Sequence, residues 1–320
     1  MYLLQQALQY GILSEKYKPV DFGKLISVDL VDFRLPAEPK DNESVLIGKP
    51  FVSPHLYIGP TGYNMRQWTG KWYEAGTKER DFLKQYGRQF NTIEHNTTHY
   101  RIPDTATVLR WRDETPFDFR FCPKIPQTIS HSRDLGVSGR EIDVFCEVIA
   151  ELGTRLGCCF IQLHPAFSPE DLPVLEKFVQ RFPVWIPLAV EVRHPDFFRG
   201  GYYSDRYFSM LRDRGISAVI TDVAGRRDVC HMRLAASSVL IRFVGNSLHP
   251  SDYARVREWS ERLNHWMENG LESAYFFTHE PDNLLAPELA AFAWQTFSAA
   301  MPDVDMRGPK EVGGQQGSLF

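Results

Sequence analysis

Eight short apolar runs recur along the chain, and a segment with helical periodicity follows most of them. The runs have the length and the β-branched content of buried strands. They cover residues 56–59, 92–96, 119–124, 158–163, 188–193, 218–222, 239–243 and 274–279. The helical segments are 81–90, 105–114, 139–156, 169–182, 205–214, 251–269 and 287–300. This alternation predicts an α/β fold, and eight units favour a single (β/α)₈ TIM-like barrel over an open doubly wound sheet.

The ends of the chain do not follow this repeat. Residues 1–54 contain no readable strand and helix pair, and 35–43 have the composition of a polar linker, so we expect an N-terminal extension. Residues 301–320 are rich in Pro, Gly and charge, which predicts a flexible C-terminal tail. The barrel is therefore expected over 55–300.

Composition fits one large core, with 43% hydrophobic and 24% charged residues in a chain of 320. A net charge of −4 argues against a general nucleic-acid coat but leaves open a local basic groove. The five cysteines are odd in number and lack CxxC spacing, which indicates a reducing cytoplasm. The start resembles no signal peptide, and no window approaches the roughly 20 apolar residues that span a bilayer, so we expect no membrane association.

Charged and amide residues end several of the predicted strands. In a (β/α)₈ barrel these carboxyl ends share one rim, which is where such enzymes carry their chemistry. Alternation along the second strand places Glu94 and Asn96 in the barrel mouth and turns Ile93 and His95 away from it. The other polar strand ends are Lys124, Gln162, Glu191, Arg193, His194, Asp222 and Arg242.

These strand ends suggest an acid–base site for an anionic substrate. The predicted catalytic residues are Glu191, Asp222, Glu94 and Lys124, with Glu191 as general acid or base beside Asp222 or Glu94. The predicted substrate-binding residues are Asn96, Gln162, Arg193, His194, Arg242 and Tyr100. The alternative is a buried ion-pair network that only closes the top of the barrel, although such a network is costly unless it serves a ligand.

Two further motifs are weaker. Gly245, Asn246 and Ser247 follow the seventh strand where barrels often bind phosphate, but one glycine is weak evidence and a plain tight turn is the favoured interpretation. His95 and His99 are four residues apart, yet there is no HExxH motif and no cysteine cluster. We therefore predict no metal and no cofactor.

Ordered motifs spread over residues 56–290 together resemble the YecE-like family, the domain of unknown function numbered 72. They are Gly59-Pro60-Thr61-Gly62-Tyr63, Trp68-Thr69-Gly70-Lys71-Trp72-Tyr73, Phe90-Asn91-Thr92-Ile93-Glu94-His95-Asn96, Phe119-Arg120-Phe121-Cys122-Pro123-Lys124, Gln162-Leu163-His164-Pro165 and Val190-Glu191-Val192-Arg193-His194-Pro195. The resemblance implies a TIM barrel and supplies no settled activity. The chain departs from the family pattern at His95 and His99, where the family usually has hydrophobic residues.

The last residues resemble the bacterial peptide that binds the DNA sliding clamp. Its pattern of Gln, any residue, Ser or Asp, Leu and Phe is matched by Gln316, Ser318, Leu319 and Phe320. A short anchor after a Gly-rich linker suits docking into a groove. The alternative is a disordered tail with an apolar end.

Three functions are compatible with these features. The first is an enzyme that acts on a nucleic-acid or phosphorylated substrate and is tethered to the sliding clamp. The second is a hydrolase or isomerase of a small sugar or phosphate metabolite, for which the tail is incidental. The third is a non-catalytic binding scaffold.

Overall fold

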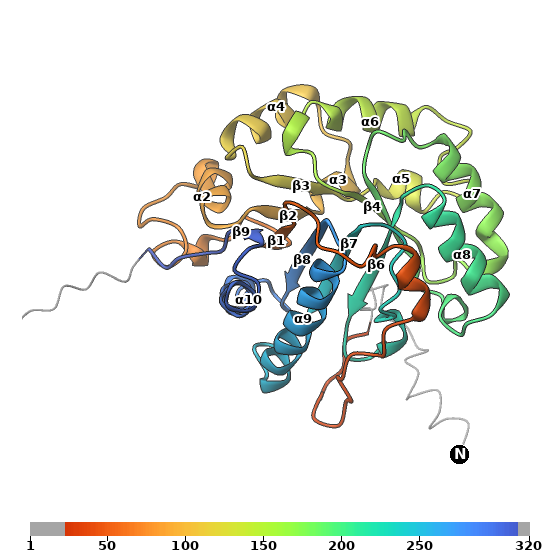
Figure 1. The fold of residues 1–320 in the computed structure, drawn as a ribbon. Helices are drawn as coiled ribbons and strands as arrows, with labels where there is room; N and C mark the ends of the chain where they lie inside the picture. The colour runs from red at the N-terminus through yellow and green to blue at the C-terminus, as the bar shows by residue number, and fades with distance from the viewer. Residues whose placement is uncertain (1–22, 313–320) are drawn as a thin grey trace, which may run out of the picture.

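The computed structural model describes residues 23–312 (Figure 1), and it confirms each of the eight predicted runs as a strand. The strands are β1 (His55–Pro60), β2 (Thr92–His95), β3 (Arg120–Pro123), β4 (Cys159–Gln162), β5 (Leu188–Glu191), β6 (Ser217–Asp222), β7 (Ser238–Val244) and β8 (Ser273–His279). The predicted peptide at 316–320 lies outside the described residues.

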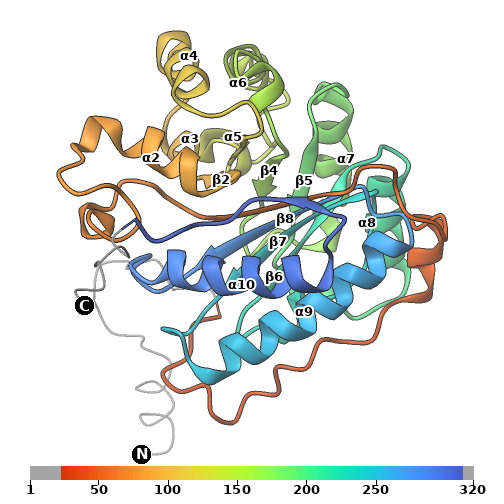
Figure 2. The ribbon, with the colours of Figure 1, turned by 60° about the vertical axis from the view of Figure 1, so that its left-hand side comes forward.

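The seven predicted helices are also present, and they lie around the outside of the strands (Figures 1 and 2). They are α2 (Phe82–Gln89), α4 (Thr105–Glu114), α6 (Glu141–Ala150), α7 (Leu172–Arg181), α8 (Tyr202–Arg212), α9 (Pro250–Glu268) and α10 (Ala286–Ala300). Short helices α3 (Thr97–Tyr100) and α5 (Gln127–Ser130) were not predicted. The 3₁₀ turns are η1 (Lys40–Ser44), η2 (Arg66–Trp68), η3 (Glu79–Asp81), η4 (Gly153–Arg155), η5 (Pro169–Asp171), η6 (Pro195–Phe197) and η7 (Arg227–Val229).

Local chemistry explains where two of these helices begin and end. A capping box starts the η5–α7 segment, because Ser168 accepts from the backbone of Glu170 while Asp171 accepts from the backbone of Ser168. Helix α6 ends earlier than the predicted residue 156. Gly153 follows it at a φ of 55°, in the left-handed region that stops a helix.

All strand pairs are parallel, as the α/β pattern predicts. Seven strands form one sheet in the order β4-β5-β6-β7-β8-β1-β9, where β9 (Asp305–Met306) was not predicted, and β2 and β3 form a separate pair. Within residues 23–312 the paired strands therefore do not form a closed ring. The predicted α/β class is confirmed, whereas the closed barrel is not.

Ladder pairing is absent at two places in the described residues, between β1 and β2 and between β3 and β4. Between β1 and β2 the side chain of Asn91 replaces ladder bonds, because its Oδ1 accepts from Ile58 N at 2.8 Å and its Nδ2 donates to Leu56 O at 3.0 Å. Gly59 allows this close approach, since a Cβ there would overlap the backbone oxygen of Thr92. Between β3 and β4 only isolated bridges link the strands, one of them between Lys124 and Phe160.

Both ends of the described chain pack against the fold, contrary to the expected linker and tail. In the extension, Asn42 is 1% exposed and its side chain bonds the backbone of Met232 and Leu234. Residues 301–312 pack as well: β9 pairs with β1, and Gly308 lies directly against the ring of Trp294. The sequence pattern did not indicate this packing, because Asn42 and Gly308 are single residues whose partners lie outside their own segments.

The core has an outer and an inner part. The larger clusters fill the space between strands and helices. A smaller cluster collects side chains from the strands alone: Tyr57, Cys122, Cys158, Phe160, Ala189, Val219, Leu240, Tyr275 and Phe277. All five cysteines are buried thiols without a disulfide. None of the helices in the described part of the chain has the length and apolarity to cross a membrane.

Candidate functional site

Polar side chains lie one pleat beyond the inner apolar cluster, toward the carboxyl ends of the strands. Side chains two positions apart share one face of a strand, so the inward face passes from apolar to polar. On β4 the step is from Phe160 to Gln162, and on β7 it is from Leu240 to Arg242. The same step yields Lys124, Glu191, Thr221 and His279, and β2 contributes Glu94.

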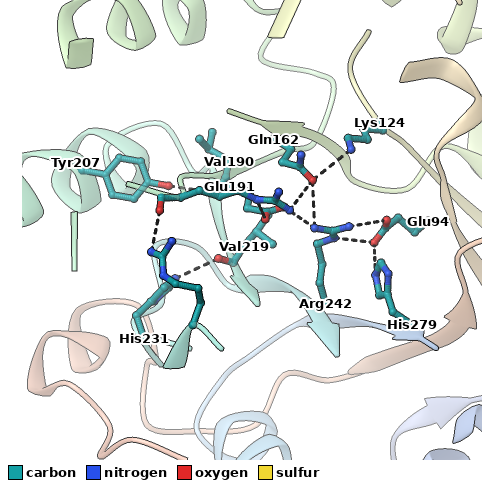
Figure 3. Close-up of polar contacts among 12 residues, drawn as sticks. Glu94, Lys124, Gln162, Val190, Glu191, Tyr207, Val219, His231, Arg242 and His279 are labelled. Carbon is teal, nitrogen blue, oxygen red and sulfur yellow. Dashed lines mark hydrogen bonds and ion pairs between the residues drawn. The ribbon is translucent and has the colours of Figure 1, made fainter. Parts of the chain in front are cut away.

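Arg242 is the centre of this group (Figure 3). It bonds both oxygens of Glu94, from Nε at 2.9 Å and from Nη2 at 3.1 Å, and it bonds Glu191 from Nη1 at 2.9 Å. The carboxylates of Glu94 and Glu191 are 0% and 2% exposed. Paired and hydrogen-bonded in this way, buried charges avoid most of their desolvation cost.

The amide oxygen of Gln162 accepts hydrogen bonds from three cationic side chains. It accepts from Arg193 Nη2 at 2.8 Å, from Arg242 Nη1 at 3.2 Å and from Lys124 Nζ at 3.2 Å. Arg193 also bonds Glu191 from Nε at 2.7 Å. Basic side chains thus outnumber carboxylates in this cluster, which favours a bound anion.

Glu94 has two further partners. His279 Nε2 lies 2.9 Å from Glu94 Oε2, and Asn96 Nδ2 donates to Glu94 Oε1 at 2.9 Å. The predicted inward orientation of Glu94 and Asn96 therefore agrees with the structure. Since Arg242 also bonds both of these oxygens, Glu94 holds its neighbours in place and has little capacity to accept a proton.

Protonation states follow from this geometry. Burial opposes ionisation of Glu94, but Arg242 and His279 outweigh it and hold the pKa of Glu94 well below its usual value. Burial likewise opposes ionisation of Glu191, and Arg193 with Arg242 lowers its pKa nonetheless. Burial and the nearby Arg242 lower the pKa of Lys124 to about 8, so this amine can exchange protons near neutral pH.

A cavity of about 620 Å³ opens beside the cluster. Its floor includes Arg193, Thr221, Arg242 and His279, and the loops after β7 and β8 form one side. The segment from Gly23 to Asp29 of the N-terminal extension also lines the cavity. This volume is in the range of small-molecule sites in enzymes.

Glu280 lines the same cavity and was not among the predicted site residues. It is 5% exposed, and its Oε2 accepts from Ser247 N at 2.8 Å, while its buried Oε1 has no hydrogen-bond partner within residues 23–312. Burial raises the pKa of Glu280 to about 7. The rule applied to the other strands could have found it, because Glu280 directly follows the last residue of β8.

Asp222 does not join the cluster, although its place at the end of β6 suggested that it would. Thr221 faces inward, so Asp222 on the next pleat faces α9. There it bonds Arg255 Nη1 at 3.0 Å and Trp259 Nε1 at 2.8 Å, and it pairs with Arg227. The prediction that Asp222 belongs to the acid–base cluster is therefore wrong. Its hydrogen bonds with Arg255 and Trp259 link α9 to β6 instead.

Two predicted substrate-binding residues also lie apart from the cluster. His194 accepts from the backbone of Asp196 at the start of η6. Tyr100 is 72% exposed and its ring meets the edge of His99.

The possible phosphate loop after β7 is a tight turn whose amides are already occupied. Asn246 N donates to Asp252 Oδ2 at 2.8 Å, and Ser247 N donates to Glu280 Oε2. The structure thus favours the simpler of the two sequence interpretations.

The histidines are not arranged around a metal. His95 packs edge-on against Trp111 with ring centroids 4.3 Å apart, and burial lowers the pKa of His95 to about 3. Across residues 23–312, no three His, Cys, Asp or Glu side chains are grouped to hold a metal ion.

Comparisons with known proteins agree on one family. The family model described as protein of unknown function DUF72 matches residues 57–312. The UPF0759 protein YecE of Escherichia coli K12 is 34% identical over 284 residues, which span 83% of this chain and 100% of that protein, and its counterpart in strain O157:H7 matches equally. Two crystal structures of a DUF72 family protein from Enterococcus faecalis V583 share the fold, with TM-scores of 0.62 and 0.60 at 20% and 18% identity; they cover 80% and 79% of this chain, and 98% and 99% of their own.

Proposed function

The chain belongs to the DUF72 family, and we propose that it is an enzyme that binds an anionic, phosphate-bearing substrate and acts on it by acid–base chemistry. The observation that carries this proposal is the cavity in which Arg193, Arg242, His279 and Glu280 meet. The matched family is described only as a protein of unknown function, so the chemistry of the site must supply the argument.

We propose that the eight strands close into a (β/α)₈ barrel with this cavity at its carboxyl-terminal rim. The inner cluster supports closure, because it joins side chains from strands on both sides of each break, such as Tyr57 of β1 and Cys122 of β3. Asn91 joins β1 to β2, and Lys124 forms a bridge to Phe160 across β3 and β4. Catalytic groups of such barrels lie at this rim.

In the proposed site Arg193 and Arg242 bind the anionic group of the substrate. A planar guanidinium suits a phosphate or carboxylate because it offers parallel N–H donors. Glu94 and Glu191 position these two arginines, as both carboxylates are held in their ionised form by ion pairs. Glu94 and Glu191 are therefore not proposed as general acid or base, and these two roles are assigned to other groups.

The proton-transfer groups in this proposal are Glu280 and Lys124. Glu280 has one oxygen without a partner and a pKa of about 7, which allows it to give or take a proton at neutral pH. Lys124, with a pKa of about 8, belongs to the same cluster through its bond to Gln162 but does not line the cavity, so Glu280 is the group that meets the ligand directly. Among the three functions considered from the sequence, this arrangement favours an enzyme over a scaffold.

We also propose that the chain is tethered to the sliding clamp through Gln316, Ser318, Leu319 and Phe320. The support is the match of these residues to the clamp-binding pattern.

The anion site is tested by calorimetric titration with phenyl phosphate. The Arg193→Ala variant should bind at least about tenfold more weakly, because a lost charge-assisted hydrogen bond costs about 1.5–3 kcal/mol. Arg206→Ala is the matched control, since Arg206 pairs with Glu176 on the outer helices. If Arg193→Ala and Arg206→Ala bind phenyl phosphate with equal affinity, Arg193 does not bind the anion and the proposed anion site is wrong.

The acid–base role is tested with Glu280→Gln against a panel of phosphate monoesters and diesters. We expect this variant to retain phenyl phosphate binding and to lose turnover of any substrate that the unmodified protein converts. Undiminished turnover in Glu280→Gln would exclude Glu280 from the chemistry.

A further inference from the structure

One wall of the cavity comes from a part of the chain that lies outside the family match. Residues 23–29 line the cavity together with Arg242, whereas the family model begins at residue 57.

The first residue of the wall, Gly23, fits tightly against the loop after β6, whereas Leu25 and Ile26 are exposed. Gly225 N donates to Gly23 O at 2.8 Å, and a Cβ on Gly225 would lie only 2.8 Å from the same oxygen. Gly23 adopts a φ of 73°, and a Cβ there would lie 2.9 Å from the side chain of Val223. Val28 is 9% exposed, and Asp29 pairs with His249 at 3.4 Å.

The residues that follow the wall, from Phe33 to Glu38, contact α9. These contacts hold the wall at its C-terminal end. Phe33 lies over the guanidinium of Arg255, with the ring centroid 4.5 Å from its central carbon. Leu35 N donates to Glu258 of α9 at 2.8 Å, and Trp266 Nε1 donates to Glu38 at 2.9 Å. Figure 2 shows this segment running beside α9 toward η1.

The wall changes what the site can accept. Arg242 lines the cavity of about 620 Å³ and is only 8% exposed, so a ligand that bonds Arg242 occupies this cavity. A site for a nucleic-acid strand instead needs an open groove that follows the backbone. Val28, Val223 and Val244 add apolar surface beside the cationic base.

We propose that residues 23–29 close the site over a small phosphate monoester with an apolar or ring-bearing portion, and that they exclude nucleic-acid strands. This inference rests on the proposed function and narrows its substrate class. The arginines select the phosphate, the valines contact the remainder of the ligand, and the extension limits its size.

The test compares two probes, phenyl phosphate and a 5′-phosphorylated oligothymidylate, on four proteins and one control variant. These are the full chain, a chain without residues 1–29, Gly225→Ala and Arg193→Ala. The shortened chain keeps the anchors at Phe33, Leu35 and Glu38. Gly225→Ala displaces the wall without removing it and serves if the shortened chain does not fold. Gly62→Ala is its control, because nothing lies within 4 Å of a Cβ at Gly62.

We expect the full chain to bind phenyl phosphate but not the oligonucleotide. Removing or displacing the wall should weaken phenyl phosphate binding about tenfold, equivalent to about 1.4 kcal/mol, and should allow the oligonucleotide to bind. Oligonucleotide binding by the full chain that is lost in Arg193→Ala would overturn this inference and leave the proposed anion site intact. Phenyl phosphate binding that is unaffected in Arg193→Ala would overturn the proposed function itself.

Discussion

Arg242 and Glu94 form a two-bond ion pair across the strands, with Nε to Oε2 at 2.9 Å and Nη2 to Oε1 at 3.1 Å. They are 148 residues apart in the chain, so the pair joins β2 to β7. Arg242 holds Glu191 of β5 as well. One guanidinium therefore fixes the relative positions of three strands at the rim.

Replacement of Arg242 by Met should destabilise the protein strongly. Glu94 would keep His279 and Asn96, and Glu191 would keep Arg193, but both buried carboxylates would lose the guanidinium that they share. Breaking a buried pair in this way costs about 3–5 kcal/mol. Urea unfolding followed by circular dichroism measures the loss. Arg66→Met is the control, because the Arg66–Glu79 pair is exposed and such pairs contribute about 1 kcal/mol or less. Similar midpoints for the two variants would show that the buried pair has no structural role.

Glu280 should make stability depend on pH. Its pKa rises from 4.5 to about 7 on folding, so the folded state holds a proton that the unfolded state has lost between these values. This contribution is complete below pH 4.5 and disappears as the pH rises through about 7. Glu280→Gln imitates the protonated form, so its melting temperature relative to the unmodified protein should increase from pH 5 to pH 8. A difference that is the same at both pH values would contradict a raised pKa.

Gly245→Ala should disturb the position of Glu280 while sparing the ion pairs of Arg242. A Cβ at Gly245 would overlap the Glu280 carboxylate and contact Leu289. We expect turnover to fall by the same order as in Glu280→Gln, while phenyl phosphate affinity changes less than about threefold. Gly62→Ala is again the matched control. Turnover at the unmodified level in Gly245→Ala would mean that the orientation of Glu280 does not matter.

Strand periodicity predicted much of this site correctly. All eight strands appeared as apolar runs, and alternation alone placed Glu94 and Asn96 on the inward face of β2. The same rule explains the error at Asp222. Its place as the last residue of β6 suggested the rim, but the inward face of that strand ends one residue earlier, at Thr221.

Long-range packing accounts for what the sequence pattern could not predict. No local signal indicates that Asn91 replaces ladder bonds between β1 and β2, or that Gly308 lies against Trp294. Residues 23–29 have neither strand nor helix periodicity, so their place in the cavity wall depends on contacts with Val223 and Gly225. The contacts of Gly23 with Val223 and Gly225 join residues about 200 positions apart in the chain.

Asp222→Asn should separate the structural ion cluster from the proposed site. Asp222 is 0% exposed and bonds Arg255 and Trp259, so the variant leaves buried Arg255 with one carboxylate partner fewer. We expect a loss of about 2–4 kcal/mol in urea unfolding and unchanged affinity for phenyl phosphate in the folded protein. A phosphate affinity that falls as much as in Arg193→Ala would return Asp222 to the binding site.

The clamp tether predicts a binding event that does not involve the cavity. A chain that lacks residues 316–320 should lose affinity for the purified sliding clamp of the same organism, measured by fluorescence anisotropy of the labelled protein. Leu319 and Phe320 would supply the apolar anchors, so Leu319→Ala with Phe320→Ala should have the same effect as the truncation. Arg193→Ala serves as the control, because it alters the cavity and leaves the tail intact. Micromolar binding that is lost in both tail variants and kept in Arg193→Ala would show that the tail binds the clamp independently of the cavity. The tail would then place the protein at DNA, while the cavity still selects a small ligand. Equal affinity of all four proteins for the clamp would mean that residues 316–320 do not bind it.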